Sequence, residues 1–407
     1  MTNSAICAIL YAIQRHVFLR EGHKGVCDVV IGLLGMGTIG SGVYEHLQKR
    51  GDISVKKILE LKRHPGFEHL ETSDYDEILS DPEIDTVVEL MGGLEPAHKF
   101  TVQALKAGKN VVSANKLMIS HHMEELLTLA RENGVQYRYD ASVGGSIPFL
   151  YNLMRHNCAD TLTAISGIVN GTTNLILDIM QTEGRDFDAV LRQAQAEGYA
   201  EANPAADIDG IDAQCKIAIA SAVAYGSYVN VDDVSTEGIR HITAEDIIRF
   251  KELRKVCRLI AQSQVVGEGV ISAYVEPTLV AENATEAAVR LNNNTISITG
   301  EYFGVHTFQG QGAGKDPTAF AVELGLRDIL DGVTPRLNLI PHGYAKVDNA
   351  TTGHRYYLRT SAPVDIPAEK HADGVYITEP LSVKAMHDLA ASLRKQDKKL
   401  FFAGIQD

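Results

Sequence analysis

The sequence predicts an α/β protein in which a doubly wound parallel sheet is followed by an α+β region and a small C-terminal α/β segment. Three observations predict this architecture. An apolar run rich in Val and Ile, residues 28–34, leads directly into a glycine-rich turn and a helical pattern. Strand and helix patterns then alternate as far as residue 116. From Thr161 onward, β-branched residues recur with period 2. A chain of 407 residues exceeds what one core usually serves, so we expect two or three domains.

The first turn has the spacing of a nucleotide-binding loop. It lies between the strand Asp28–Leu34 and the helical pattern SGVYEHLQKRG, and it fits the pattern GxGxxG. Glycines allow a tight turn and a close backbone approach, so a pyrophosphate can sit on the helix N-terminus. An ordinary strand–helix turn is the alternative. The turn consists of Gly35, Met36, Gly37, Thr38, Ile39 and Gly40.

The next strand, Ser54–Leu59, ends at Glu60, where an acid would bind the ribose 2′-hydroxyl of NAD. Lys62 and Arg63 follow and could instead hold the 2′-phosphate of NADP. Surface placement of all three residues is the simpler alternative. The sequence therefore leaves the choice between NAD and NADP open.

Later strand ends in this half carry further candidates. The strand Thr86–Leu90 runs into Gly92-Gly93, which would leave room for a dinucleotide. The strand NVVSANK ends at Lys116, although a lysine in that place is usually solvent-exposed. A helix Glu124–Glu132 and a strand Tyr137–Tyr139 lead to the glycine-rich turn DASVGGSIPFL, which by itself suits a plain loop.

The densest group of charged residues is the acidic run, residues 194–216, with the sequence AQAEGYAEANPAADIDGIDAQCK. Glu197 belongs to the preceding helix, which Gly198 ends. Pro204 and the two alanines after it predict a non-helical middle. Asp209 or Gly210 would cap a helix that continues into the apolar IAIASAVAY.

On that helix Asp212 and Lys216 stand four residues apart and share one face. Clustered carboxylates suit an ammonium ligand, and a nearby amine can protonate a developing alkoxide. The alternative is an acidic capping loop with a solvated ion pair, worth only about 0.3–0.5 kcal/mol. The other carboxylates of interest are Glu201, Asp207 and Asp209.

The acidic run resembles the signature of the homoserine dehydrogenases: an alanine, a spaced Gly-aromatic-small group, Asn/Asp-Pro, then Asp-x-x-Gly-x-Asp-x-x-x-Lys. Asn203 stands where many members carry Asp. With the glycine-rich turn, Ser-Ala-Asn-Lys, DASVGGSIPFL and the segment Gly310–Thr318, the resemblance covers residues 28–330. It implies hydride transfer from NAD(P)H to the aldehyde of L-aspartate 4-semialdehyde, giving L-homoserine.

The resemblance also implies roles for individual residues. Lys216 would donate or relay a proton, Asp212 would orient it, and Lys116 would place the carbonyl beside the cofactor. Glu201 and Asp207 would hold the ammonium and hydroxyl side of the substrate, which the loop at Gly171 and Thr172 would touch. The cofactor-binding residues would be Gly35, Gly37, Thr38, Ile39, Gly40, Gly92, Ser113, Lys116 and Gly314. Carbonyls for a monovalent cation, Na⁺ or K⁺, would come from Asp140, Val143, Gly145 and Ile147.

The second half reads as helices Leu175–Glu183 and Phe187–Glu197, strands Val265–Val275 and Asn294–Gly300, and a helix from Gly310 to about Leu330. Its broad sheet would pair subunits into a homodimer or homotetramer, as the resemblance implies. We expect an extension at 1–26, an NAD(P)-binding domain at 27–140, a substrate and dimerisation domain at 141–310, a helix returning to the cofactor domain at 311–332, and a truncated ACT-like region at 333–407.

That last region resembles an ACT regulatory domain from which a helix and a strand are missing. HRYYLRT, residues 354–360, matches the first strand of such a domain. VDIPAEKHADG then runs directly to a strand Val375–Thr378, a helix Ser382–Arg394 and a strand Leu400–Ile405. We infer that threonine feedback is lost. The alternative is that the remnant still pairs with another subunit and binds an effector through the loop Pro363–Asp373.

Composition excludes several classes of protein. A net charge of -14 argues against nucleic acid or an anionic membrane as a partner. No apolar run approaches the roughly 18 residues of a membrane span. Five scattered cysteines without CxxC suit a reducing cytoplasm, and the histidines show no HExxH or paired metal spacing.

Two other functions compete with the family assignment. Another NAD(P)-linked amino-acid oxidoreductase is one, but aspartate-semialdehyde dehydrogenase would need a cysteine nucleophile that no motif here supplies. A non-catalytic nucleotide-binding regulatory protein is the other. Lys116, Asp212 and Lys216 argue against it, because a pure binder has no use for a proton donor.

Overall fold

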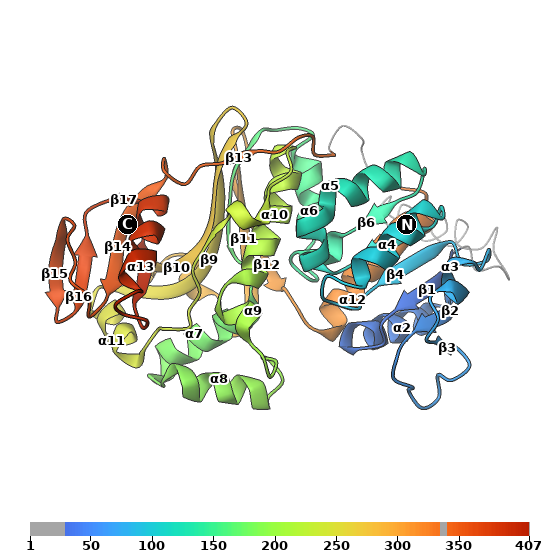
Figure 1. Ribbon diagram of the computed structural model, residues 1–407, viewed down its shortest axis with the longest axis horizontal. Coiled ribbons are helices and arrows are strands. Elements are labelled where there is room, and N and C mark those ends of the chain that lie inside the picture. The colour runs from blue at the N-terminus through green and yellow to red at the C-terminus, as the bar shows by residue number, and fades with distance from the viewer. Residues whose placement is uncertain (1–28, 334–339, 407) are drawn as a thin grey trace, which may run out of the picture.

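The computed structural model describes residues 29–333 and 340–406, which form two lobes joined through a central helix (Figure 1). The extension expected at residues 1–26 lies outside the described residues, as do Cys7, Cys27 and Asp28. Within the described ranges, none of the helices is both long and apolar enough to cross a membrane.

The first lobe is built on a six-stranded parallel sheet in the order β3-β2-β1-β4-β5-β6. The strand order reverses between β1 and β4, and such sheets bind dinucleotides outside the carboxyl ends of the strands at that point. The predicted doubly wound sheet is confirmed. Its strands are β1 (Val29–Leu34), β2 (Ile53–Leu59), β3 (Glu71–Thr72), β4 (Thr86–Glu89), β5 (Asn110–Ser113) and β6 (Tyr137–Arg138).

Helices cover the two faces of this sheet: α2 (Thr38–Arg50), α3 (Asp76–Leu79), α4 (Ala97–Lys106), α5 (Lys116–Glu132) and α12 (Lys315–Leu330). Helix α12 returns from the second lobe and packs on α2, where a Cβ at Gly42 would lie 3.2 Å from that of Ala319. Gly42 therefore lets the two helices approach closely. The expected start of α12 at Gly310 is wrong, because Gly310 and Gln311 still belong to β12 (Gly304–Gln311).

The second lobe is built on a mixed sheet in the order β12-β11-β7-β9-β10-β18-β14-β16-β15. The single strand expected at Val265–Val275 is wrong. β9 ends at Gly267, and Gly269 adopts a left-handed φ of 65° in the turn to β10. The strands are β7 (Leu162–Ile168), β9 (Lys255–Gly267), β10 (Val270–Ala281), β11 (Asn293–Gly300), β14 (Gly353–Arg359), β15 (Ala368–Ala372), β16 (Val375–Thr378) and β18 (Phe401–Ile405), with β8 (Ser235–Thr236), β13 (Lys346–Val347) and β17 (Leu381–Ser382) beside them.

The C-terminal region continues this sheet. β18 pairs in parallel with β10 and antiparallel with β14, and α13 (Val383–Leu393) packs on the strands through Met386 against a core that includes Tyr356 and Phe402. The expectation that VDIPAEKHADG runs directly into the strand at Val375 is wrong, since it contains β15, joined to β16 by a turn at Gly374 with φ 68°.

Six helices complete the second lobe: α6 (Phe149–His156), α7 (Gly171–Glu183), α8 (Phe187–Ala196), α9 (Ala205–Ile208), α10 (Ile211–Tyr225) and α11 (Ala244–Glu252). Helix α10 packs against α5 of the first lobe and against β9 and β10 of the second. It is apolar almost all round, as expected of a helix buried on every face. The chain therefore presents Asp212 and Lys216 from the helix that joins the lobes.

Candidate active site

A pocket lies between the two lobes, where four segments far apart in the sequence converge. Gly92 and Gly93 follow β4, Lys116 begins α5, Asp212 and Lys216 come from α10, and residues 312–314 precede α12. Glu201 and Ala206 of the acidic run also line it. The pocket therefore joins the predicted dinucleotide site to the predicted catalytic residues.

Three charged residues form the centre of this wall, and we call Asp212, Lys116 and Lys216 the lysine cluster. The Nζ atoms of Lys116 and Lys216 lie 2.8 Å and 2.7 Å from the two carboxylate oxygens of Asp212. The side chains of Asp212 and Lys216 are 4% and 7% exposed, whereas Lys116 is 43% exposed. The solvated ion pair weighed from the sequence is wrong, because the pair is buried and shared with a second lysine.

The electrostatics of the lysine cluster keep Asp212 ionised. Burial alone would raise the pKa of Asp212, but the charges of Lys216 and Lys116 and their hydrogen bonds outweigh it and hold the pKa below its usual value. The Asp212 carboxylate in turn raises the pKa of Lys116, against the effect of burial. Asp212 is therefore a carboxylate and Lys116 an ammonium group at neutral pH.

Local structure fixes these side chains. Gly210 precedes α10 with a left-handed φ of 85°, which places Asp212 in the first helical turn and Lys216 one turn later. The Lys216 Nζ also donates to the Val169 carbonyl at 2.7 Å. The prediction of a non-helical stretch before Gly210 is wrong, since residues 205–208 form the short helix α9.

Asn170 is a site residue that the sequence did not reveal. It caps α7, where its side-chain oxygen accepts a hydrogen bond from the Thr173 amide at 2.8 Å. Its Nδ2 donates to Asp212 at 2.8 Å and to Asp207 at 2.7 Å. Burial, together with the charge of Asp212, raises the pKa of Asp207. The only local signal was an Asn at the start of a helix pattern.

The expected substrate residues divide into two groups. Glu201 is exposed and lines the pocket, whereas Asp207 is not among the lining residues and is linked to Asp212 through Asn170. Gly171 and Thr172 begin α7 rather than forming a loop, and the Thr172 hydroxyl donates to the Tyr199 carbonyl at 2.9 Å. Neither of these two is among the residues that line the pocket.

Asp209, the remaining carboxylate of the acidic run, is not among the residues that line the pocket. It forms a two-pronged ion pair with Arg240, in which both N···O distances are 2.6 Å.

Glu60 stabilises the glycine-rich turn by accepting a hydrogen bond from the Met36 amide. The carboxylate of Glu60 accepts hydrogen bonds from the amides of Met36, Leu61 and Lys62 at 3.0, 2.8 and 3.2 Å. Burial would raise the pKa of Glu60, but these amides lower it overall. Gly35 has φ 96°, and a Cβ at Gly40 would lie 2.1 Å from the Gly35 carbonyl oxygen, so the turn requires both glycines.

The expected cofactor residues form three groups: residues that line the pocket, residues of the glycine-rich turn, and one buried residue. Ile39, Gly92, Lys116 and Gly314 line the pocket. Gly35, Gly37, Thr38 and Gly40 form the turn and the start of α2 beside Ile39. Ser113 is fully buried, and its hydroxyl donates to Glu89 at 2.6 Å and accepts from the Asn115 amide at 3.1 Å, so it supports the pocket from beneath.

The expected cation loop faces a cavity of its own. Asp140, Gly145 and Ile147 line it together with Leu324 and Asp328 of α12. Burial raises the pKa of Asp140, and its buried Oδ1 has no hydrogen-bond partner among the described residues. An orphaned carboxylate oxygen beside a loop of backbone carbonyls fits a small cation.

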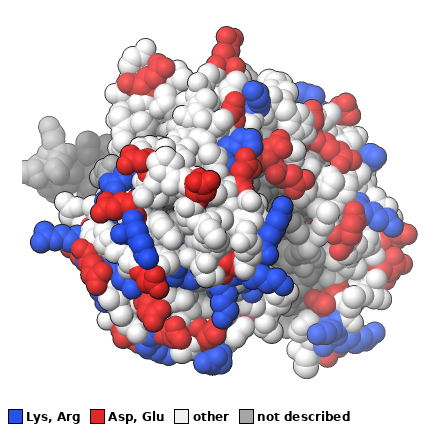
Figure 2. Space-filling model, turned by 60° about the vertical axis from the view of Figure 1, so that its left-hand side comes forward, with Lys and Arg blue, Asp and Glu red and all other residues white. Residues whose placement is uncertain are grey.

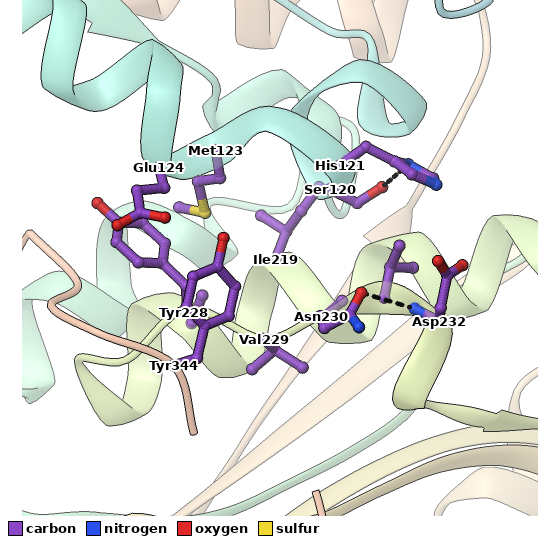
Figure 3. A pocket seen from close by; sticks show the side chains of 13 residues that line it. Ser120, His121, Met123, Glu124, Ile219, Tyr228, Val229, Asn230, Asp232 and Tyr344 are labelled. Atoms are coloured by element: carbon purple, nitrogen blue, oxygen red, sulfur yellow. Dashed lines mark hydrogen bonds between the residues drawn. The ribbon is translucent and has the colours of Figure 1, made fainter. Parts of the chain in front are cut away.

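A further cavity lies on the same pair of helices, about one turn beyond the lysine cluster. Figure 3 shows Ser120, Met123 and Glu124 of α5 above Ile219 of α10, with Tyr228 and Tyr344 at one end. The two tyrosine rings stand 5.7 Å apart between centroids. None of the catalytic, substrate, cofactor or cation residues expected from the sequence lines this cavity.

Comparisons with known proteins match both lobes of the chain. The family described as "Homoserine dehydrogenase, NAD binding domain" matches residues 35–140, and the family "Homoserine dehydrogenase" matches residues 148–330. A homoserine dehydrogenase of Synechocystis is 41% identical over 322 residues, 75% of this chain and 74% of that protein. One from Bacillus subtilis is 37% identical over 355 residues, 84% of this chain and 79% of that protein.

Solved structures give the same result. The crystal structure of a homoserine dehydrogenase from Thiobacillus denitrificans superposes with a TM-score of 0.82 and 30% identity, covering 93% of this chain and 98% of that one. A hyperthermophilic archaeal homoserine dehydrogenase mutant in complex with NADPH shares the fold, with a TM-score of 0.65 and 24% identity over 76% of this chain and 99% of that one.

Proposed function

The chain belongs to the homoserine dehydrogenase family, and from this premise we propose how its residues interconvert L-homoserine and L-aspartate 4-semialdehyde. As an NAD(P)-dependent oxidoreductase it acts through a nicotinamide, which supplies or accepts the hydride when bound. The observation that carries the proposal is the lysine cluster at the wall of a pocket that Ile39 of the glycine-rich turn also lines.

Lys216 is the proposed proton donor. An ammonium group has three N–H donors, and two of those on Lys216 go to Asp212 and the Val169 carbonyl. The third can reach the oxygen of an aldehyde bound in the pocket and protonate it as negative charge develops. Asp212 fixes the direction of this group, and Lys116 places the carbonyl from the cofactor side.

Glu201 and Asp207 are the proposed partners of the substrate's ammonium and hydroxyl side. Glu201 stands at the mouth of the pocket, where a carboxylate can meet an α-ammonium group. Asp207 is held by Asn170 and shares that amide with Asp212.

Gly35, Gly37, Thr38, Ile39, Gly40, Gly92 and Gly314 are the proposed contacts of the dinucleotide. The occupant is NADP or NAD, since Glu60 is already engaged by three amides and Lys62 and Arg63 lie exposed beside it. The NADPH in the archaeal relative supports a nicotinamide here. A monovalent cation, Na⁺ or K⁺, is proposed for the carbonyls of Asp140, Val143, Gly145 and Ile147, with the orphaned oxygen of Asp140 as support.

The proposal extends to the assembly and the cellular setting. β12 is an exposed edge strand with Val305 62% exposed, and such an edge can pair with a second copy in a homodimer or homotetramer. Figure 2 shows acidic and basic side chains interspersed over one face, a surface without a broad basic field for nucleic acid or an anionic membrane. The scattered cysteines favour the cytoplasm.

The test follows NADH and NADPH absorbance with L-homoserine, in Na⁺, K⁺ and tetramethylammonium salts. D-Homoserine is the matched control, because it has the same charges with the opposite handedness. We expect turnover with the L-isomer alone, and higher turnover in Na⁺ or K⁺. Turnover of neither isomer would contradict the assignment of the pocket, and equal rates in all three salts would contradict the cation site.

The C-terminal region is proposed to have lost feedback by threonine. β14, β15, β16 and β18 continue the sheet of the second lobe, and α13 is the one helix described after residue 340. Activity should stay constant across millimolar L-threonine. Cooperative inhibition would show instead that this region binds an effector.

A further inference from the structure

A cluster of metal-ligating side chains lies outside the pocket, on the surface of the first lobe where α4 and α5 pack together (Figure 1). His98 comes from the first turn of α4, and His122 and Glu125 come from α5. One ligand atom from each residue lies within 4.8 Å of the other two. We propose that these three residues bind a divalent transition-metal ion such as Zn²⁺.

The distances suit tetrahedral coordination. The His98 Nε2 lies 2.8 Å and the His122 Nδ1 lies 3.6 Å from the same carboxylate oxygen of Glu125. Nitrogen and oxygen ligands about 2.0–2.1 Å from a tetrahedral zinc ion stand roughly 3.3–3.4 Å apart. The two observed N···O separations lie on either side of that value.

A fourth residue, Glu95, lies where it can accept a hydrogen bond from the ring nitrogen of His98 that does not bind the metal. The other ring nitrogen of His98, Nδ1, lies 3.3 Å from the Glu95 carboxylate. Metal-bound histidines usually donate this second N–H to a carboxylate, which fixes the tautomer and the ring orientation. Glu95 thus prepares Nε2 of His98 as the metal-binding atom.

The backbone and the exposure fit the same site. His122 departs from helical geometry, with φ -127° and ψ 17°, and its ring stacks on that of His98 with centroids 3.8 Å apart, so one ring must turn out of the stack for both nitrogens to face one ion. The side chains of His98, His122 and Glu125 are 18%, 29% and 46% exposed, so an ion can enter from solvent and keep water as its remaining ligand. His, His and Glu with an open position are a donor set that zinc accepts.

Such an ion would clamp α4 to α5. His122 stands less than two helical turns from Lys116 along α5, so the clamp also fixes the helix that carries one lysine of the lysine cluster. The sequence did not reveal the site, because His98 and His122 belong to different helices and each pairs at helical spacing only with a glutamate.

The test titrates Co²⁺ and Zn²⁺ into the untagged full-length chain stripped with a chelator. Co²⁺ is followed by its visible absorption and Zn²⁺ by calorimetry. We expect one equivalent of tight uptake by the wild type, and loss of that equivalent in His98→Gln and in His122→Gln. His121→Gln is the matched control: the neighbouring His121 faces the Leu117 carbonyl at 2.9 Å, so its replacement should leave uptake unchanged.

The variant Glu95→Gln tests whether Glu95 only hydrogen-bonds to His98 or itself binds the metal ion. Its replacement should keep the stoichiometry but weaken affinity about 10–100-fold. Circular dichroism of each variant confirms that the fold is retained. The proposal is overturned if the folded His98→Gln and His122→Gln variants still take up the ion with wild-type affinity, or if the wild type takes up none. Neither result depends on the assignment of the dehydrogenase pocket.

Discussion

Two buried carboxylates in this protein each lie between two cationic side chains. The two clusters differ in how many hydrogen-bond donors of these cations are not bonded to the protein. The lysine cluster holds Asp212 between Lys116 and Lys216. The arginine cluster, which we define as Asp178, Arg258 and Arg290, holds Asp178 between two guanidinium groups at N···O distances of 3.4 and 2.9 Å.

In the arginine cluster every side-chain nitrogen of the buried Arg258 is hydrogen-bonded, whereas Arg290 is 59% exposed. Arg258 is 1% exposed and donates to the carbonyls of Cys257, Glu286, Ala287 and Val289 as well as to Asp178. The lysine cluster instead faces a pocket and keeps N–H donors that are not committed to the protein. Burial of an ion pair is therefore common to both clusters, and the spare donors that face a pocket are the reason why we propose the lysine cluster as the catalytic site.

The largest expected effect is on turnover in Asp212→Ala, which removes the shared partner of both lysines. We expect kcat to fall about 10²–10⁴-fold, the usual contribution of an oriented general acid, while the cofactor Kd changes only a few-fold. Asp209→Ala is the matched control from the same acidic run, because Asp209 pairs with Arg240. Similar losses of kcat in Asp212→Ala and Asp209→Ala would contradict a specific role of Asp212 in turnover.

The first of these clusters could be predicted only in part. Asp212 and Lys216 are neighbours on one helical face, so their pairing follows from spacing. Lys116 lies in the other lobe and reaches Asp212 only because α10 packs on α5. Asn170 joins Asp212 and Asp207 from the cap of another helix. No periodicity reveals such contacts between distant segments.

The fold, too, was predicted only in part, because some of its features follow from local sequence patterns and others do not. The glycine-rich turn and the alternating strands and helices are local patterns, and they predicted the parallel sheet correctly. The hairpin between β9 and β10 was missed because β-branched residues continue on both sides of a short turn at Gly269. Pro204 was read as a helix breaker, although proline is tolerated at a helix start, and α9 begins directly after it.

The second prediction concerns stability and the arginine cluster. Arg258→Met removes a buried partner and leaves Asp178 undercompensated, which should lower the free energy of unfolding by about 3–5 kcal/mol. The kcat of the folded fraction should stay near the wild-type value. Urea unfolding and turnover measured on the same preparation check this. A variant of wild-type stability with reduced kcat would reverse the roles of the two clusters.

The third prediction uses pH. The pKa of Asp212 is lower in the folded chain than in the unfolded one. Its ionised form therefore stabilises the fold fully above the unfolded value of about 3.9, and this stabilisation is lost as pH falls through the lower folded value. The difference in unfolding free energy between wild type and Asp212→Asn should be constant from pH 7 to about 5 and shrink toward pH 3. A difference that grows on acidification would contradict the assigned sign.

The smallest effect is expected at the mouth of the pocket. Glu201 is exposed, and exposed ion pairs contribute about 0.2–1 kcal/mol, so Glu201→Gln should raise the KM for L-homoserine roughly 2–5-fold. Glu197→Gln is the control, because the Glu197 carboxylate accepts a hydrogen bond from Gln193 and does not line the pocket. An unchanged KM would make Glu201 an ordinary loop carboxylate.

The most direct test of the account is Lys216→Met, which keeps most of the side-chain volume and removes the proposed proton donor. Turnover of L-aspartate 4-semialdehyde, the Kd for NADPH and urea unfolding would be measured on one preparation. The account predicts that kcat falls at least 100-fold while the Kd stays within a few-fold of the wild type and the chain stays folded. A folded variant with near-wild-type kcat, or a kcat loss fully explained by lost NADPH binding, would contradict it.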